Sequence, residues 1–493
     1  MTNEELLSYG LGASVKYSRQ DGGPRLTLSY PLKVIRLHPL WVPVFTELSQ
    51  SRFLSFGAIL SLVHPARAFD VESFLNELVR KGFLIQDGSP KLLDIPTVSI
   101  IIPVRNRPEE LRSCLESLRR LAYPAQKREV IVVDDASDDS TPDTVSQFSA
   151  SLISLRERKG ASFCRNLAAS QTKGEILAFI DSDCTADPRW LNDLIPAFRD
   201  RALGAVGGIV VPFSEEKALD RYEQVKSSLQ MGARYRSSRE EGPFFYVPSC
   251  NLLVRKTPFI EIGGFREDLH VGEDVDFCWR LRDHGHNLEY RPIGKVYHRH
   301  RNELKAFCAR RFEYGVSEPL LHQYHPERKK QLVFSPATLS FWILIVFTLL
   351  SRQFLLTGLC GLLLLGDSYY KHWRLRRENI LLPYLHILLA TARSYLGFFY
   401  HCCAFVSRYY LGCSFLFGYN FPSVTLVILG THLVAGTVEF FTKRPALNFL
   451  SYWFFFSLEQ LSYQSGVWWG CLRRLSFNPV NPHIRFTWQH ENV

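Results

Sequence analysis

The chain has 493 residues, which is too long for one ordinary domain and predicts two or three units, each with its own core. Lys and Arg outnumber Asp and Glu by 58 to 48. The basic residues gather beside apolar stretches, as at Glu327–Lys330 and Lys371–Arg377, and basic and aromatic side chains do not alternate in a stripe. This distribution favours a membrane surface as a partner and argues against nucleic acid.

Residues 1–94 predict a small α/β module that resembles a winged helix, followed by a linker. The expected elements are a strand at Leu32–Leu37 and apolar-periodic segments at Val42–Leu48, Phe56–Val63 and Val71–Lys81. Gly82 ends the last helix, and the stretch Gln86–Pro96 has the composition of a linker. The module has no clustered carboxylates or metal-ligand spacing, so we expect it to accept a peptide as an added strand. A packing or dimerisation module is the alternative.

Residues 95–318 predict an α/β domain with a doubly wound sheet. Short apolar runs at Val98–Ile102, Glu129–Val133 and Ile176–Ile180 alternate with helical stretches at Glu109–Leu121 and Ala161–Gln171. Short β-branched runs between helices are typical of buried parallel strands. Ligands of such sheets bind beyond the carboxyl ends of the strands.

Residues 319–493 predict an apolar, helical, membrane-associated region. Its apolar runs are Pro336–Leu350, Phe354–Leu365, Ile380–Phe421, Val424–Phe441 and Leu447–Cys471. Several are shorter than the roughly 20 residues that span a bilayer, so some of them fit re-entrant or interfacial helices. Burial in a large soluble domain is the alternative, but charged residues that would cover such a domain are scarce here.

The eleven cysteines form no Cys-x-x-Cys pair, and the N-terminus lacks the basic and apolar regions of a signal peptide. We therefore expect a protein of the cell membrane whose catalytic domain faces the reducing cytoplasm, with free thiols.

Polar side chains follow three of the predicted strands. Pro103 and Arg105 follow the first, Asp134 and Asp135 the second, and Asp181 and Asp183 the third. Two carboxylates at a strand end offer the oxygen ligands that Mg²⁺ or Mn²⁺ prefers, with room for diphosphate oxygens. Three polar strand ends in chain order predict a nucleotide site, in which the cation offsets the charge of a departing diphosphate.

Two acids and two arginines stand further along the chain. Glu273 and Asp274 occupy the expected start of a helix, where anionic side chains are favoured. We take Asp274, and Glu273 second, as the base that removes a proton from an acceptor hydroxyl, although either acid could simply cap the helix. Arg310 and Arg311 could reach the leaving diphosphate, because guanidinium matches phosphate geometry.

These residues resemble the family 2 glycosyltransferases of the GT-A fold over Val98 to about Glu318. The shared features are the Ile-Ile-Pro opening, Val-Asp-Asp-x-Ser, Gly160 with Arg165-Asn166, Asp-Ser-Asp and Gly-Glu-Asp-x-Asp. The resemblance implies an inverting transfer from a nucleotide sugar, with Pro103, Arg105, Asp135 and Arg165 around the nucleoside. It also implies that Asp181 and Asp183 frame the diphosphate and metal, and that Asp274 is the base.

The resemblance further implies a histidine as third metal ligand after the last strand, and both His298 and His300 stand there. His298 is the preferred ligand, and a structural pair is the alternative. The chain departs from the family at Val104-Arg105, where a small residue and Tyr are common, which leaves the nucleoside contacts there open.

The whole layout is similar to the mycofactocin-system glycosyltransferases, from the N-terminal module through Gly-Glu-Asp-Val-Asp to Arg-Arg-x-x-Tyr-Gly. That similarity implies UDP-glucose as donor, a peptide-derived redox cofactor as acceptor, and repeated β-linked glucosylation.

Three other functions are compatible with parts of the chain. A transferase acting on a lipid-linked or polysaccharide acceptor fits the apolar tail. A noncatalytic nucleotide-sugar sensor should lack one of the acids, and all are present. A transporter should show longer spans and broken helices in related halves, which the sequence does not show clearly.

Overall fold

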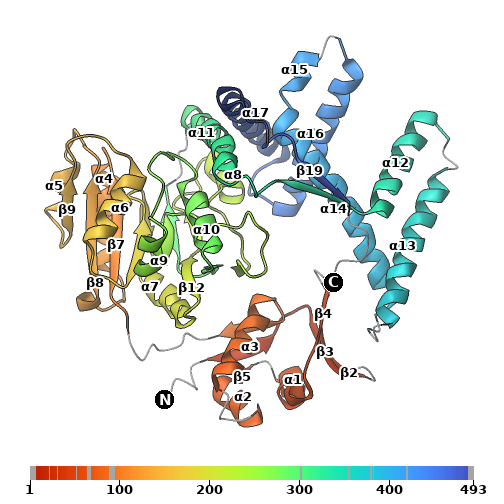
Figure 1. Cartoon of the computed structure of the whole chain (residues 1–493), viewed down its shortest axis with the longest axis horizontal. Helices are drawn as coiled ribbons and strands as arrows, with labels where there is room; N and C mark the ends of the chain where they lie inside the picture. Colours follow the sequence, from red (N-terminus) through yellow and green to blue (C-terminus); the bar gives the residue numbers. More distant parts are fainter. Residues whose placement is uncertain are drawn as a thin grey trace. The chain divides into compact units, whose positions relative to one another are not determined.

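The structure is a computed structural model that describes residues 7–20, 23–29, 32–51, 53–63, 68–87, 95–299, 303–353, 356–377, 380, 382–417 and 420–486 (Figure 1). The chain divides into two compact units. One is built mainly from Asp87–Tyr324, and the other from Tyr9–Gln86, His325–Arg444 and the chain after Phe456. The predicted domain limits of 1–94, 95–318 and 319–493 stay a prediction, and the predicted linker lies largely outside the described residues.

The first unit is organised around an eight-stranded mixed sheet with the order β14-β16-β12-β15-β10-β7-β8-β9. Its strands are β7 (Val98–Val104), β8 (Arg128–Asp134), β9 (Ser151–Ser154), β10 (Ile176–Ile180), β12 (Leu203–Gly207), β14 (Arg236–Ser237), β15 (Asn251–Arg255) and β16 (Asn287–Tyr290). The run β10-β7-β8-β9 is parallel, whereas β15 lies antiparallel to β10 and β12. The predicted α/β class and the three predicted parallel strands are therefore confirmed.

Helices cover both faces of this sheet, because alternate side chains of each buried strand point to opposite faces. Ile100 and Ile102 of β7 join the core under α4, whereas Ile101 joins the core under α6 and α10. The helices of this unit are α4 (Pro108–Arg119), α5 (Thr141–Val145), α6 (Ala161–Gln171), α7 (Trp190–Leu194), α8 (Ala218–Lys226), α9 (Lys256–Glu261), α10 (Glu273–Asp283) and α11 (Leu304–Tyr324). Short 3₁₀ turns lie at Ala125–Lys127 and Ile195–Arg199.

A second, three-stranded sheet lies beside the carboxyl end of β10. It has the order β11-β17-β13, with β11 (Cys184–Ala186), β13 (Val210–Pro212) and β17 (Val296–His298). β11 begins directly after the Asp181-Ser182-Asp183 segment, and Cys184 pairs with His298 across the antiparallel ladder. This pairing brings the chain at residue 298 next to the chain at residue 183.

The N-terminal segment contains more strands than the sequence indicated. Its strands are β1 (Ser8–Leu11), β2 (Val15–Gln20), β3 (Gly23–Ser29), β4 (Leu32–Arg36), β5 (Leu54–Ser55) and β6 (Leu84–Asp87), and its helices are α1 (Val42–Gln50), α2 (Phe56–Val63) and α3 (Ala68–Arg80), with a 3₁₀ turn at Pro39–Trp41. β2, β3 and β4 form an antiparallel sheet, and β5, β1 and β6 form another. The predicted helices are present, and the likeness to a winged helix stays a prediction.

The C-terminal segment is mostly helical. Its elements are β18 (Gln331–Phe334), α12 (Pro336–Ser351), α13 (Thr357–Arg377), α14 (Tyr384–Tyr410), α15 (Cys413–Phe417), α16 (Pro422–Lys443), α17 (Phe449–Arg474) and β19 (His483–Phe486). β18 and β19 pair in parallel. Within α14 and α17, the indole of Trp468 donates to the carbonyl of Tyr409 at 2.8 Å, and Arg408 lies 3.7 Å from the centre of the Tyr463 ring.

One helix of the described residues, α16, is long and apolar enough to cross a membrane, with a mean hydropathy of 1.7 over its most apolar window. Only 22% of that window is buried, which is unlike the core helix of a soluble protein. α12 adds a shorter apolar stretch, Pro336–Thr348. One such helix is weak evidence, so membrane association stays a prediction.

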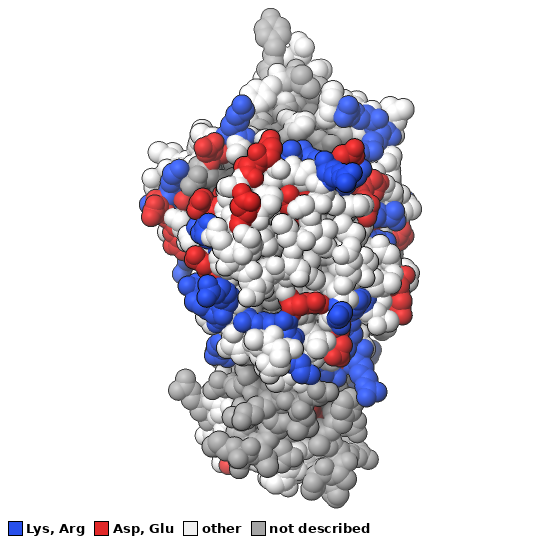
Figure 2. All heavy atoms as spheres, turned by 90° about the vertical axis from the view of Figure 1, so that its left-hand side faces the viewer, with Lys and Arg blue, Asp and Glu red and all other residues white. Residues whose placement is uncertain are grey.

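Charges of both signs mix on the part of the surface that Figure 2 shows. There the coloured Lys and Arg residues lie interspersed with Asp and Glu around an area that carries neither. The described residues on this face therefore form no continuous basic stripe of the kind that tracks a nucleic-acid backbone.

All eleven cysteines of the chain are free thiols.

Candidate functional site

The carboxyl ends of β7, β8 and β10 meet at one edge of the sheet. The parallel register pairs Pro103 with Val133 and Val104 with Asp134 across β7 and β8, and Ile101 with Phe179 across β7 and β10. The segments that follow these strands therefore start side by side. They carry the polar residues that the sequence singled out at the three strand ends.

The predicted nucleoside residues organise the loops at this edge. Both oxygens of the Asp135 carboxylate accept backbone hydrogen bonds, from Lys159 at 2.6 Å and from Gly160 at 3.0 Å. Gly160 has a φ of 93° at the start of α6, a conformation that favours glycine. Asp134 accepts from Ser137 at 3.3 Å, and the Arg105 Nε donates to the Ala136 carbonyl at 3.4 Å. Asp134 and Asp135 are thus buried loop anchors in this structure.

A buried guanidinium connects the two ends of the site. The Arg165 side chain is 3% exposed and donates to Asp181 at 2.6 Å and to Glu273 at 3.0 Å. Burial disfavours its charge, but the two carboxylates outweigh that effect and raise the pKa of Arg165. The sequence placed this arginine beside the nucleoside, and the structure places it between the acid after β10 and the acid at the start of α10.

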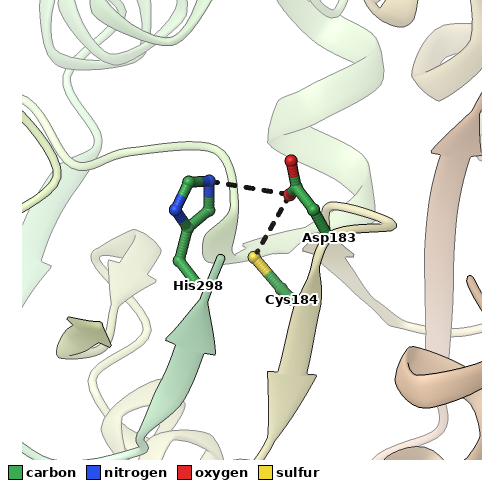
Figure 3. Close-up of side chains that lie close together, drawn as sticks. All are labelled: Asp183, Cys184 and His298. Atoms are coloured by element: carbon green, nitrogen blue, oxygen red, sulfur yellow. Dashed lines mark hydrogen bonds and ion pairs between the residues drawn. The ribbon is translucent and has the colours of Figure 1, made fainter. Parts of the chain in front are cut away.

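Asp183 lies in a second cluster, with Cys184 and His298 (Figure 3). The His298 Nε2 lies 3.6 Å from the Asp183 Oδ1, and the Cys184 thiol lies 3.8 Å from the same oxygen. The other oxygen, Oδ2, is in an ion pair with Arg107, just before α4. Burial favours the neutral form of Asp183, but the charges of His298 and Arg107 outweigh it and lower the pKa of this carboxyl.

The chemistry of this cluster fits a divalent cation. Asp183 and His298 offer an oxygen and an imidazole nitrogen that Mn²⁺ accepts, and Asp181 lies two residues before Asp183. Cys184 fits less well, because burial raises the pKa of its thiol well above the usual range, whereas a metal binds the thiolate. His300 lies outside the described residues, and the structure places His298 beside Asp183.

The two acids predicted to face the acceptor begin α10, as the sequence predicts. Gly272 precedes the helix with a φ of 83°, and Glu273 and Asp274 form its first turn. Asp274 is half-buried, and its oxygens accept from the backbone N–H groups of Ser249 at 3.3 Å and Val275 at 2.8 Å. Burial first, and then the neighbouring charge of Glu273, raise the pKa of Asp274 to about 7. A carboxyl with this pKa is suited to general base work near neutral pH.

The third acid of this segment has a structural position. Asp276 is fully buried, and it pairs with Arg266 at 3.0 Å and with Arg280 at 2.7 Å. Arg280 also donates to the carbonyls of Ile262 and Gly264 at 2.7 and 2.6 Å. Asp276 therefore ties α10 to the turn after α9, while Glu273 and Asp274 remain at the site.

The two arginines of α11 have different surroundings. Arg311 is buried, and its guanidinium pairs with the equally buried Glu223 of α8 at 2.6 Å. Arg310 is 38% exposed and lies 4.9 Å from the centre of the Tyr314 ring. Burial disfavours the charge of Arg310, but Tyr314 and the Glu273 carboxylate outweigh this and raise its pKa. Of the two predicted phosphate ligands, the structure brings Arg310 near Glu273 and commits Arg311 to an internal pair.

The sequence reasoning assigned no individual role to two residues of the site. Arg107 stands just after the Arg105-Asn106 turn, and its pairing with Asp183 joins segments 76 residues apart. Ser249 donates its N–H to Asp274, and its hydroxyl lies 3.4 Å from a Glu273 oxygen. Parallel pairing of β7 with β10 could have suggested Arg107, since both segments leave the sheet at the same edge.

The sequence of this chain is similar to those of known proteins. The Glycosyl transferase family 2 profile matches residues 99–263. A pre-mycofactocin glycosyltransferase of Mycobacterium tuberculosis is 30% identical over 400 residues, which cover 79% of this chain and 82% of that protein. The chain belongs to glycosyl transferase family 2. It is a glycosyltransferase with the GT-A type of mixed α/β sheet, as the resemblance implied.

Other family 2 relatives are similar over shorter stretches. Glycosyltransferase AglE of Haloferax volcanii is 32% identical over 217 residues, which cover 41% of this chain and 70% of AglE. Among solved structures, the mannosyltransferase PcManGT of Pyrobaculum calidifontis, in complex with GDP-Man and Mn²⁺, has 16% identity and a TM-score of 0.44 over 76% of this chain and 88% of that chain. A likeness of that degree does not identify the donor or metal of this chain. The roles of all the predicted site residues, inside and outside the matched range 99–263, stay predictions.

The paired arginines of α11 give a first test. We expect Arg310→Gln to weaken binding of a nucleoside diphosphate about tenfold or more, as one charge-assisted hydrogen bond is lost, with little change in thermal stability. Arg311→Gln should instead destabilise the protein by about 3 to 5 kcal/mol, because it leaves Glu223 buried without its partner. Calorimetric titration with UDP and thermal unfolding of both variants measure the two effects. Each variant removes one charge from the same helix turn, so each is the control for the other, and the reverse pattern would contradict the assignment.

Proposed function

We propose that this family 2 glycosyltransferase is an inverting, metal-dependent hexosyltransferase that moves glucose from UDP-glucose to a peptide-derived redox cofactor of the mycofactocin type. Repeated transfer would build a β-linked oligosaccharide. The observation that carries the proposal is the bridge from Asp181 through buried Arg165 to Glu273. It supports a single site in which a metal-bound donor and an acceptor hydroxyl lie close together.

The donor end of the proposed site is formed by Asp181, Asp183 and His298. These residues would hold Mg²⁺ or Mn²⁺, which when bound supplies positive charge to offset that of the departing diphosphate. Pro103, Arg105, Asp134, Asp135 and Arg165 would lie around the nucleoside, in part by shaping the loops that receive it. Arg310 would face the diphosphate, whereas Arg311, which the sequence also assigned to it, pairs with Glu223.

The acceptor end is formed by Asp274, with Glu273 beside it. As the acceptor oxygen attacks the anomeric carbon, the bond from that carbon to the diphosphate breaks, and Asp274 takes the hydroxyl proton. One displacement of this kind inverts the anomeric configuration. Arg165 and Ser249 hold the Glu273 carboxylate, which supports Asp274 as the base of the two.

The acceptor assignment rests on the relative from Mycobacterium tuberculosis, whose name gives pre-mycofactocin as its substrate, and on the layout of the chain. The N-terminal module would bind the peptide-derived part of the acceptor as an added strand. A lipid-linked or polysaccharide acceptor is the second candidate. The exposed apolar side chains of the tail favour it, among them Ile343 at 58%, Leu362 at 65% and Leu426 at 69% exposure.

Asp274 gives a test by mutation and by pH. We expect Asp274→Asn to bind UDP and Mn²⁺ nearly as the wild type does but to lose transfer by several orders of magnitude. In the wild type, transfer should rise with pH through about 7, because the base must be ionised. The matched variant Glu273→Gln should still show a rise of transfer with pH, but at lower pH, because the Glu273 charge that helps raise the pKa of Asp274 is removed. A product with retained configuration, or an unchanged rate in Asp274→Asn, would refute the role.

The same carboxyl should affect stability. Its pKa is higher in the folded than in the unfolded state, so the folded state binds more protons between about pH 4 and pH 7 and loses stability as the pH rises through that range. Asp274→Asn removes the titrating carboxyl and with it this fall in stability. Its melting temperature should therefore exceed that of the wild type more at about pH 8 than at about pH 5.

The function itself is tested by release of UDP from UDP-glucose with the peptide-derived cofactor as acceptor, in Mn²⁺ and in excess chelator. We expect release to need both the acceptor and the metal, and a set of lipid-linked acceptors to be poor substrates. Deletion of residues 1–90 should raise the KM for the acceptor and leave UDP binding unchanged. Full activity in chelator would exclude the metal, and preference for lipid-linked acceptors would establish the second candidate.

The tail gives a separate test. We propose that it holds the protein at the cytoplasmic face of the cell membrane, because basic clusters at Arg328–Lys330 and Lys371–Arg377 flank its apolar helices. After cell lysis the full-length protein should sediment with membranes and be released by detergent. Recovery of the protein entirely in the soluble fraction without detergent would count against this proposal.

A further inference from the structure

We propose that Arg107 competes with the metal ion for Asp183 and so makes metal binding depend on the nucleoside diphosphate. The inference rests on the proposed metal-dependent function. It concerns an arginine that neither the family motif nor the comparisons assign. Two guanidinium groups pair with the two acids that follow β10, Arg165 with Asp181 and Arg107 with Asp183.

Arg165 and Arg107 hold Asp181 and Asp183 in different ways. Arg165 is almost fully buried and bound on both sides, by Asp181 and by Glu273, so it has no freedom to leave. Arg107 is 32% exposed, and Asp183 is the one carboxylate that it pairs with among the described residues. Of the two guanidinium groups, Arg107 is therefore the one that can turn away.

The position of Arg107 opposes a metal ion. Its Nη1 lies on Oδ2 of Asp183, while His298 faces Oδ1 of the same carboxylate. Burial disfavours the charge of Arg107, but the charges of Asp183 and then Asp181 outweigh it and raise its pKa. A cation bound by Asp183 and His298 would share a carboxylate with a positive group. Repulsion between the two, and competition for Oδ2, must both lower the affinity for a metal arriving alone.

A diphosphate changes this balance. It brings negative charge to the edge where Arg107 is exposed, and guanidinium binds phosphate oxygens in its forked geometry. Arg107 can then exchange Asp183 for the diphosphate, which frees the carboxylate for the metal. Binding of metal and nucleotide becomes cooperative, and the cooperativity is the same whichever ligand binds first. The metal would thus enter the site together with the donor and leave with the nucleoside diphosphate.

The test measures Mn²⁺ affinity of the full-length protein by calorimetry, alone and with saturating UDP, in the wild type and in Arg107→Gln. Without UDP, Arg107→Gln should bind Mn²⁺ about threefold or more tightly than the wild type, because a half-exposed ion partner is removed. The factor by which UDP tightens Mn²⁺ binding should fall by at least a similar amount. Arg107→Lys keeps the charge but lacks the fork, so it should bind Mn²⁺ alone about as weakly as the wild type, while UDP should tighten its Mn²⁺ binding less. This variant gives a second readout if Arg107→Gln folds poorly.

Arg112→Gln is the matched control. Arg112 lies on α4, which begins directly after Arg107, and donates to Gln147 at 2.6 Å rather than to an acid of the site. Its Mn²⁺ affinity should equal that of the wild type. Equal or weaker Mn²⁺ binding by Arg107→Gln, with a wild type that binds, overturns this inference alone. Absence of Mn²⁺ binding in every variant, with and without UDP, overturns the metal site of the proposed function as well.

Discussion

The site depends on one buried cation, the guanidinium of Arg165. It joins Asp181, at the end of a strand, to Glu273, at the start of a helix. Asp181 lies 16 residues after Arg165 in the sequence, and Glu273 lies 108 residues after it. Buried charges are stable only when they are paired, so the three groups hold one another in place. Removal of the arginine would leave two acids facing each other beside Asp183 and Asp274. This contact ties the proposed donor end of the site to its proposed acceptor end.

Arg165 also separates the roles of the adjacent acids at the start of α10. It keeps a positive charge against Glu273, whereas Asp274 is half-buried and, among the residues that the structure describes, accepts only the backbone N–H groups of Ser249 and Val275. Two neighbouring carboxyls in unlike surroundings ionise at different pH, and the one with the raised pKa is suited to exchange a proton near neutrality. The sequence analysis ranked Asp274 above Glu273, and the structure offers a physical reason for that order.

Much of the central fold could be predicted from the sequence. Ile176–Ile180 and Ala161–Gln171 appear as strand and helix with the limits that the pattern indicated, because fully apolar runs and a helix that follows Gly160 are strong local signals. The hairpin of β2 and β3 was not predicted, since Val15–Ser29 is half polar and its strands are stabilised by pairing with each other. The local sequence pattern predicts single helices and strands, but it does not show which strands pair with each other.

The functional site was predicted in part for the same reason: the sequence shows candidate residues but not their contacts. Strand-end acids are visible because they follow apolar runs, but the partner of each acid is decided by tertiary pairing. Arg311 reads like a phosphate ligand in the sequence, and its contact with Glu223 of α8 appears only in three dimensions. Asp276 belongs to the same motif as Asp274, yet the Asp276 carboxylate already pairs with Arg266 and Arg280. An acid or arginine in a motif is thus a candidate for chemistry only when the fold leaves its charge available to a ligand. By this criterion Asp274 remains available, and the partly exposed pairs of Arg107 with Asp183 and of Arg310 with Glu313 can open to a ligand. Asp276 and Arg311, in contrast, are used to hold the helices that carry them.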